Sequence, residues 1–242
     1  MNFNRISQYA LTCILAVLIF LPSNAQSIIR IGFKTHPNFS FSSIADKSNF
    51  DRNLFSVRNG LIGLNVGACV NFQRNEWLLE FATGINSNRT GLKFHNNLDI
   101  AQLSMRTLSF TNELNFGIRV FMSNKPYYEV FLTSSYSYSL VAIQKLSGNS
   151  QFENIINYEE IYPNLDLSWQ SSNLGTGVRI RTQLKNGRKF DYGISFRVAV
   201  KKYPEIGMKI EYPTETFQTL VRPRLTALNI DFIYYFGKRK SS

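Results

Sequence analysis

Residues 225–236 read Leu-Thr-Ala-Leu-Asn-Ile-Asp-Phe-Ile-Tyr-Tyr-Phe, and this stretch decides the fold. Side chains in a β-strand alternate between two faces, so the stretch separates into two sets. The apolar and aromatic face comprises Leu228, Ile230, Phe232, Tyr234 and Phe236. The opposite face, from Ala227 to Tyr235, carries Asn229 and Asp231. A membrane-spanning β-strand needs about 9–11 residues, so the length and the alternation together predict such a strand.

The same alternation recurs in seven segments upstream. We expect strands at Ile28–Thr35, Leu61–Phe72, Trp77–Asn88, Met105–Phe121, Tyr127–Ile143, Trp169–Leu184 and Phe190–Tyr203. The connections between them alternate in length. The short ones are residues 73–76, 122–126 and 185–189, and the long ones are residues 36–58, 89–103, 144–168 and 204–222. An antiparallel meander puts all long connections at one end, as in outer-membrane barrels. The sequence therefore predicts an all-β fold, an eight-stranded antiparallel up-and-down transmembrane β-barrel.

The second face of these strands decides between a membrane barrel and a soluble one. A soluble lipocalin-like barrel with an apolar ligand cavity is the alternative, and it needs a charged exterior. The second face is instead rich in Gly, Ser, Thr and Asn, with a few charges of both signs. This composition suits a crowded polar interior, so we expect the apolar faces to meet lipid.

The charges on the polar face have opposite-sign neighbours on adjacent strands. We expect a structural ionic network in the lumen, made by Glu80, Glu113, Arg119, Glu129, Arg179, Arg181, Asp191, Arg197 and Asp231. Arg181 is expected near Glu129 and Asp191, and Asp231 between the strands that carry Arg197 and Lys34. Paired charges set strand register, and side chains just fill an eight-stranded barrel, so an open pore is not expected.

Aromatic residues gather beside the short turns. They predict a girdle at the lipid–water interface, formed by Phe72, Trp77, Phe121, Tyr128, Tyr192, Tyr234 and Phe236.

The N-terminal segment resembles a secretory signal. Arg5 supplies a positive charge, residues 10–21 are apolar, and Ser23-Asn24-Ala25 is a small-residue cleavage site. We expect a signal peptide at residues 1–25, a barrel domain at residues 26–242, and a location in the outer membrane of a Gram-negative bacterium. An uncleaved anchor helix is the alternative, but its apolar core is too short for a span. Cleavage leaves a single cysteine, Cys69, which we interpret as a small buried residue.

The formal net charge of +11 usually indicates an anionic partner. Export makes nucleic acid a poor candidate, so we expect bases in the lumen and on loops. We expect outer-membrane lipid around a monomer, and a protein or surface ligand at the four long loops.

Three segments carry a family resemblance. The signal end Ser23-Asn24-Ala25-Gln26, the first strand Ile31-Gly32-Phe33-Lys34 running into Asn38-Phe39-Ser40, and the last strand at residues 228–236 resemble the PorT-like outer-membrane β-barrel family. That family usually has Gly where this chain has His36-Pro37. The resemblance implies the same barrel, and the family's name derives from a member needed for protein secretion across the outer membrane.

Candidate catalytic groups are few. The chain has two histidines, His36 and His95, with Ser40, Ser42, Ser87 and Asp99 nearby in sequence; we interpret both histidines as solvated loop residues. No metal-ligand spacing or phosphate-binding glycine loop is present, so we assign no catalytic, metal or cofactor-binding residue and no cofactor. Three functions remain: a non-enzymatic barrel with a structural or surface-interaction role, an accessory barrel of a secretion system, and a lipid-modifying enzyme.

Overall fold

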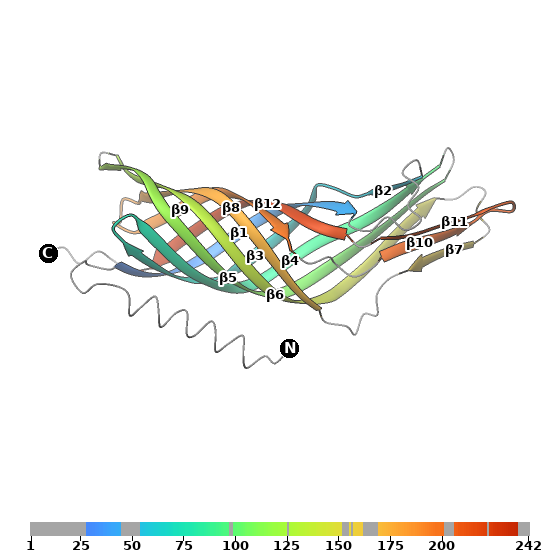
Figure 1. Ribbon diagram of the computed structural model, residues 1–242, viewed down its shortest axis with the longest axis horizontal. Helices are drawn as coiled ribbons and strands as arrows, with labels where there is room; N and C mark the ends of the chain where they lie inside the picture. The colour runs from blue at the N-terminus through green and yellow to red at the C-terminus, as the bar shows by residue number, and fades with distance from the viewer. Residues whose placement is uncertain are drawn as a thin grey trace.

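A closed β-barrel forms one half of the molecule in the computed structural model (Figure 1). The structure describes residues 28–44, 54–96, 99–124, 126–151, 155, 157–161, 169–200, 206–221 and 223–236. Within these residues, eight strands pair antiparallel in the order β4-β3-β1-β12-β9-β8-β6-β5, and pairing of β4 with β5 closes the ring. These strands are β1 (Ile28–Ile44), β3 (Leu61–Arg74), β4 (Trp77–His95), β5 (Ile100–Asn124), β6 (Tyr127–Gln151), β8 (Trp169–Gln183), β9 (Lys189–Ala199) and β12 (Pro223–Phe236).

The pairing of β1 with β12 joins the two ends of the described chain. The last strand, β12, lies between β9 and β1, with Ile31 opposite Phe236 and Asn38 opposite Asn229. Because the first and last strands pair, the barrel has no free edge. The predicted fold class is therefore confirmed. The predicted signal peptide and the tail after Phe236 lie outside the described residues.

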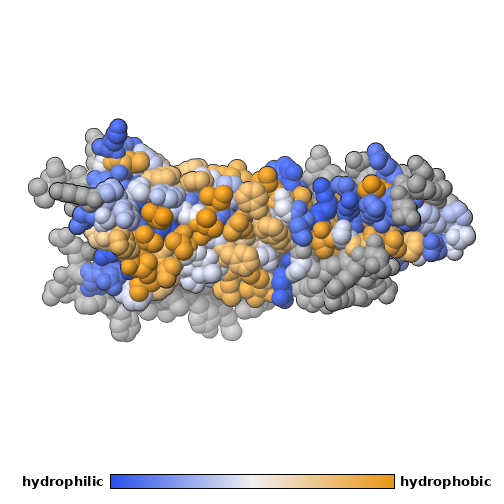
Figure 2. Space-filling model, turned by 90° about the horizontal axis from the view of Figure 1, so that it is seen from above, coloured by the Kyte–Doolittle hydropathy of each residue, from blue (hydrophilic) through white to orange (hydrophobic). Residues whose placement is uncertain are grey.

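The two faces of each spanning strand meet different surroundings. On β5, Phe110, Leu114 and Phe116 are 40–51% exposed on the outside, whereas Thr111 and Glu113 are buried inside. Figure 2 shows the outward apolar side chains as a broad orange zone over the barrel. An apolar outside and a polar inside are what a membrane barrel requires, because lipid offers no hydrogen bonds. Among the described residues, no helix is long and apolar enough to cross a membrane.

The first strand is longer than predicted. The residue pattern predicts an end at Thr35 and a polar loop from residue 36, but β1 continues to Ile44. Pro37 explains the error, because proline lacks a backbone N–H and usually excludes an inner strand. The pairing with β12 skips His36 and Pro37, while the pairing with β3 is continuous from Ile28 to Ser40. The unbroken pairing with β3 is sufficient for the strand to continue past the proline.

The other long loops are also largely strand. β4, β5 and β6 extend well beyond the apolar zone, and short strands join them: β2 (Phe55–Val57), β7 (Asn157–Ile161), β10 (Ile206–Glu211) and β11 (Thr216–Val221). β2 pairs with β4, and β11, β10 and β7 form a separate three-stranded sheet. Figure 1 shows these elements together at the end of the barrel opposite the C-terminus. We call this assembly the cap.

The cap has a hydrophobic core of its own. Its buried members are Phe55, Leu92, Phe94, Ala101, Leu103, Met105, Ala199, Ile206, Met208, Ile210, Val221 and Leu225. On β4 the inward face is therefore apolar at Leu92 and Phe94 but polar at Glu80, within the barrel. The same strand reverses its hydrophobic face where it leaves the membrane, because the cap buries its inside against protein and exposes its outside to water.

The short connections and the aromatic residues lie at the opposite end. Gly187 in the β8–β9 turn adopts a φ of 79°, the positive φ that an Asn-Gly pair supplies in a tight hairpin. Of the predicted girdle, Trp77, Phe121, Tyr192 and Phe236 are exposed. The other three members are half-buried: Phe72, Tyr128 and Tyr234. The Phe121 and Tyr128 rings stack with centroids 5.4 Å apart, and Tyr234 and Phe236 lie edge to face at 5.7 Å.

Candidate functional site: the barrel lumen and its cap

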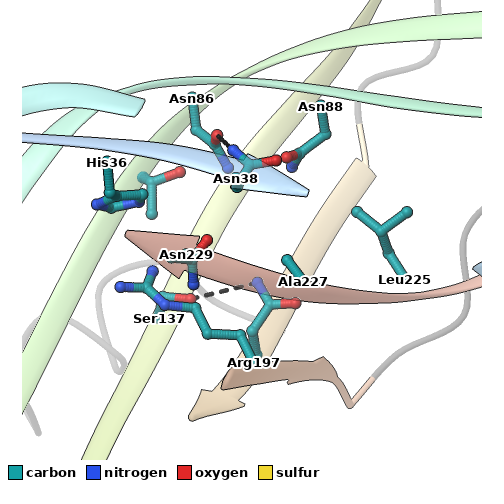
Figure 3. A pocket seen from close by; sticks show the side chains of 11 residues that line it. His36, Asn38, Asn86, Asn88, Ser137, Arg197, Leu225, Ala227 and Asn229 are labelled. Carbon is teal, nitrogen blue, oxygen red and sulfur yellow. Dashed lines mark hydrogen bonds between the residues drawn. The ribbon is translucent and has the colours of Figure 1, made fainter. Parts of the chain in front are cut away.

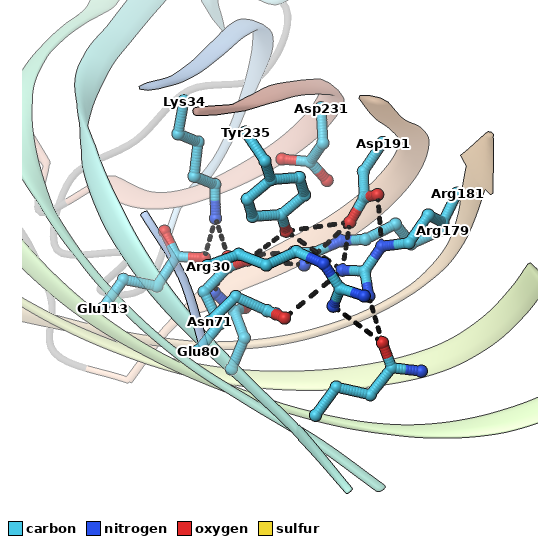
Figure 4. A network of polar contacts seen from close by, with 12 residues as sticks. Arg30, Lys34, Asn71, Glu80, Glu113, Arg179, Arg181, Asp191, Asp231 and Tyr235 are labelled. Atoms are coloured by element: carbon cyan, nitrogen blue, oxygen red, sulfur yellow. Dashed lines mark hydrogen bonds and ion pairs between the residues drawn. The ribbon is translucent and has the colours of Figure 1, made fainter. Parts of the chain in front are cut away.

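Glu80 is the centre of the polar network in the lumen, and its side chain is fully buried. Arg179 donates two hydrogen bonds to its carboxylate, at 2.8 and 3.2 Å. Lys34 Nζ and Asn115 Nδ2 donate to Glu80 Oε1 at 3.3 and 3.2 Å, and the Tyr235 hydroxyl donates to Oε2 at 3.1 Å. These donors come from four different strands, so one carboxylate ties opposite walls of the barrel together (Figure 4).

Arg181 forms a second centre nearer the short turns. Its Nε and Nη2 donate to the two oxygens of Asp191 at 2.7 and 2.8 Å, a bidentate pair of the strong kind. Nη1 donates to Gln73 Oε1 at 2.7 Å. The guanidinium carbon lies 5.1 and 5.0 Å from the ring centroids of Phe131 and Tyr235, which cover it from two sides. Arg181 is thus fully buried yet satisfied.

The remaining predicted acids of the lumen are Glu113, Glu129 and Asp231. Glu113 Oε1 accepts hydrogen bonds from Lys34 Nζ and from Arg197 Nη2, both at 2.8 Å. Glu129 Oε1 accepts from Arg119 Nη1 at 2.6 Å. The structure therefore brings eight predicted residues into one continuous polar cluster. They are Glu80, Glu113, Arg119, Glu129, Arg179, Arg181, Asp191 and Arg197.

Asp231 is the exception among the predicted network residues. Its strand does lie between the strands that carry Arg197 and Lys34. Its close polar contact, however, is with His36, whose Nδ1 lies 3.5 Å from Asp231 Oδ1. Neither of these two atoms makes a hydrogen bond within the described residues. Asp231 therefore lies at the edge of the network and not within it.

His36 corrects the interpretation of the histidines. It is 2% exposed inside the barrel, not solvated on a loop, because β1 continues past Thr35. His95, at the end of β4, is exposed as expected. Ser40 is buried and donates to Asn38 Oδ1 at 3.3 Å, and Asp99 accepts from the Tyr212 hydroxyl at 2.7 Å in the cap. These contacts do not join His36 or His95 to a serine.

A small polar cavity separates the ionic network from the cap core. Its volume is about 30 Å³, room for about two water molecules. It is lined by His36, Asn38, Asn86, Asn88, Thr111, Ser137, Asn173, Arg197, Leu225, Ala227 and Asn229. Figure 3 shows the amide and hydroxyl groups pointing into it, with Leu225 at its border. Leu225 also belongs to the cap core, so the cavity borders that core.

Several lumen residues escaped the predicted network. The structure adds Lys34, Gln73, Phe131 and Tyr235 to the predicted set. Alternation from Asp231 through Ile233 puts Tyr235 on the inner face, so this residue could have been found. No pattern in the sequence indicates that Phe131 covers Arg181. Cys69 is buried, as interpreted. Among the described residues, no group of three His, Cys, Asp or Glu could hold a metal ion.

Comparisons with known proteins give structural similarity without sequence similarity. No protein-family model matches the chain, and no curated protein matches its sequence. The outer membrane protein OprG from Pseudomonas aeruginosa is similar at a TM-score of 0.42 and 12% identity, covering 87% of this chain and 95% of OprG. Neisserial surface protein A gives a TM-score of 0.42 and 12% identity over 87% of this chain and 99% of that one. Ail of Yersinia pestis gives a TM-score of 0.35 and 10% identity over 86% of this chain and 98% of Ail.

The strand pairings and side-chain placement, rather than these similarities, establish the barrel. A closed antiparallel barrel with an apolar exterior and a polar interior occurs in the outer membranes of Gram-negative bacteria. The chain is an integral outer-membrane β-barrel protein. The short turns and the C-terminal end of β12 lie at one end of the barrel and the cap at the other (Figure 1); in outer-membrane barrels the short turns face the periplasm.

Proposed function

We propose that the protein is a non-enzymatic surface barrel whose cap binds a partner outside the cell. The observation that carries this proposal is the cap core, which gives the outer segments a packed structure of their own. Outer loops that serve only as connections need no such core, whereas binding residues are usually held in position by a rigid scaffold. The partner is expected to contact the outer sheet of β7, β10 and β11 or the tips of β5 and β6.

The closed lumen supports an interaction role over a transport role. Arg181 and Glu80 are fully buried in a cluster that joins the strands, and apolar side chains lie above the cavity. An eight-stranded barrel has an interior that side chains just fill. A continuous water path through this interior is therefore not expected, and we predict a barrel that does not conduct ions in planar bilayers.

The experiment that tests this proposal labels single cysteines on intact cells. Gln218→Cys puts a thiol on an exposed position of β11, and Lys185→Cys puts one on the exposed β8–β9 turn as the matched control. A membrane-impermeant maleimide should label Gln218→Cys and leave Lys185→Cys unlabelled. Labelling in the reverse pattern would put the cap in the periplasm and overturn a role outside the cell. Steady ion conductance of the purified barrel would overturn the closed lumen.

An accessory role in a secretion system is the second candidate. It rests on the PorT-like resemblance of the first and last strands, in which residues 31–34 pair with residues 233–236. Co-purification with components of a secretion complex would favour this role over an independent surface barrel.

The absence of enzymatic activity is tested by the histidines. His36→Ala and His95→Ala should leave the lipid profile of the outer membrane unchanged, because neither histidine hydrogen-bonds to a serine within the described residues. An altered lipid profile would instead favour the third candidate function, a lipid-modifying enzyme.

A further inference from the structure

A basic cluster lies on the outer surface of β4 and β5, where the barrel meets the cap. Arg89 on β4 and Arg106 on β5 are directly opposite each other in the strand register, and both are exposed. Arg58 lies one step further along the same face, where its backbone N–H donates to Gly91 O at 2.9 Å. β6 brings Lys145 to the register position next to Arg106. We call Arg58, Arg89 and Arg106 the rim cluster.

Among the described residues, the side-chain hydrogen bonds of the rim cluster go to serine hydroxyls. Arg106 Nε donates to Ser87 Oγ at 3.1 Å, and Arg58 Nη1 donates to Ser104 Oγ at 2.6 Å. No ion pair between described residues includes a member of the cluster. Like charges directly opposite each other destabilise a sheet. An anion held between the two guanidinium groups would remove this repulsion.

The height of the cluster relative to the membrane identifies the source of that anion. Arg89 follows Trp77, a girdle residue, by 12 residues along β4. A tilted strand rises about 2.5 Å per residue along the membrane normal, so Arg89 lies about 30 Å above Trp77. This distance equals the thickness of the hydrocarbon core, about 30 Å. Arg89 therefore lies at the headgroup level of the outer leaflet.

The surface on either side of the cluster agrees with this placement. Below it, towards the short turns, Ile85 and Phe110 are 55% and 51% exposed and face lipid. Above it, Lys93 and Gln102 are paired on the outward face, while the inward face holds the cap core. Figure 2 shows the same change from the orange zone to blue side chains along the molecule.

We propose that the rim cluster binds a phosphate group of the phosphorylated glycolipid of the outer leaflet. Guanidinium groups match phosphate because their planar N–H donors form paired hydrogen bonds with its oxygens. Arg89 and Arg106 come from adjacent strands, so a phosphate between them also removes their mutual repulsion. This inference is separate from the proposed partner of the cap, because it concerns the membrane-facing rim and not the outer sheet.

The experiment measures binding of bisphosphorylated lipid A to the purified full barrel in detergent by native mass spectrometry. The variant Arg89→Gln/Arg106→Gln is compared with Lys185→Gln/Arg188→Gln, which removes the same charge at the short-turn end. A heat-dependent gel shift checks that each variant is folded. Lipid A from which both phosphates have been removed, and inorganic phosphate as competitor, separate lipid-bound phosphate from acyl chains and from free phosphate.

We expect the rim variant to bind lipid A about 30-fold more weakly, which corresponds to about 1 kcal/mol for each of the two bases. The control should change affinity by less than about 3-fold, and dephosphorylated lipid A should bind the native protein as weakly as lipid A binds the rim variant. Inorganic phosphate should compete poorly, since it lacks the acyl chains that remain in the apolar zone.

Equal lipid A affinity in the rim variant and the native protein would overturn the proposal, as would equal binding of the dephosphorylated lipid. Strong competition by inorganic phosphate would also overturn it, because the site would then recognise a free anion. If the double variant does not fold, Arg89→Gln and Arg106→Gln alone provide the test, each with an expected loss of about 5-fold.

Discussion

Replacement of Glu80 by glutamine tests whether the lumen network holds the barrel together. Glu80→Gln keeps the shape of the side chain but removes the charge that Arg179 and Lys34 share. The new amide NH2 also faces donors, so at least one hydrogen bond from Arg179 is lost. Asp191 lies 3.9 Å from Arg179 and Glu113 lies 2.8 Å from Lys34, so both bases retain partial compensation.

The expected loss of unfolding free energy is about 3 kcal/mol. Removing one partner of a buried ion pair costs about 3–5 kcal/mol, because the other charge remains buried. Glu80 is fully buried, so solvent screening does not reduce this figure, while the retained contacts favour its lower end. Unfolding in urea is followed by tryptophan fluorescence in lipid vesicles, and the heat-dependent gel shift is an independent readout.

A double-mutant cycle separates the ion pair from other effects of the substitution. Arg179→Gln alone should also destabilise the barrel, and the double variant should lose less than the sum of the two single losses. Glu211→Gln is the control, since its partly exposed ion pair with Lys209 lies in the cap and should contribute no measurable stability. A loss below about 1 kcal/mol for Glu80→Gln, or additive losses in the cycle, would refute the reasoning.

Three further predictions concern the packing of β3 against β4, the cap core and the buried thiol of Cys69. Gly67→Ala should lower stability by about 1–3 kcal/mol in urea unfolding, because a methyl group there overlaps the backbone carbonyl of Thr83 on β4; unchanged stability would mean that β3 and β4 are less tightly packed. Phe94→Ala should cost about 3–5 kcal/mol in the cap and expose it to limited proteolysis, with the gel shift of the barrel retained; loss of the shift would show that the cap and the barrel fold as one unit. Cys69, 2% exposed, should react with a soluble maleimide only after unfolding, and rapid labelling of the folded protein would contradict a filled lumen.

Local patterns in the sequence predicted the spanning strands well, as β12 illustrates. Its alternation from Leu228 to Phe236 was read correctly because lipid demands an apolar side chain at every second position. The same rule identified Glu80, Arg179 and Arg181 as inward residues. It did not extend to β1 beyond Thr35, because the effect of Pro37 depends on a neighbouring ladder that is not visible in the chain itself.

Partner choice in the lumen could be predicted only in part. Arg181 and Asp191 are close across a short turn, so their pairing follows from local register. Arg179 and Glu80 are far apart in sequence, and their contact depends on how strands on different sides of the barrel are staggered. Asp231 shows the limit, since neighbouring strands suggested Arg197 and Lys34 but the side chain lies against His36.

The sequence by itself determined the strand pattern, the polar interior and the membrane location, because the bilayer imposes one rule on every spanning residue. The tertiary structure alone decided the cap. Leu92 and Phe94 belong to a segment whose pattern predicted a polar loop, and their apolar side chains are buried in a core that they share with residues of β10 and β11. Outside the membrane, which face is buried depends on the packing of segments far apart in the chain, and no local periodicity contains that information.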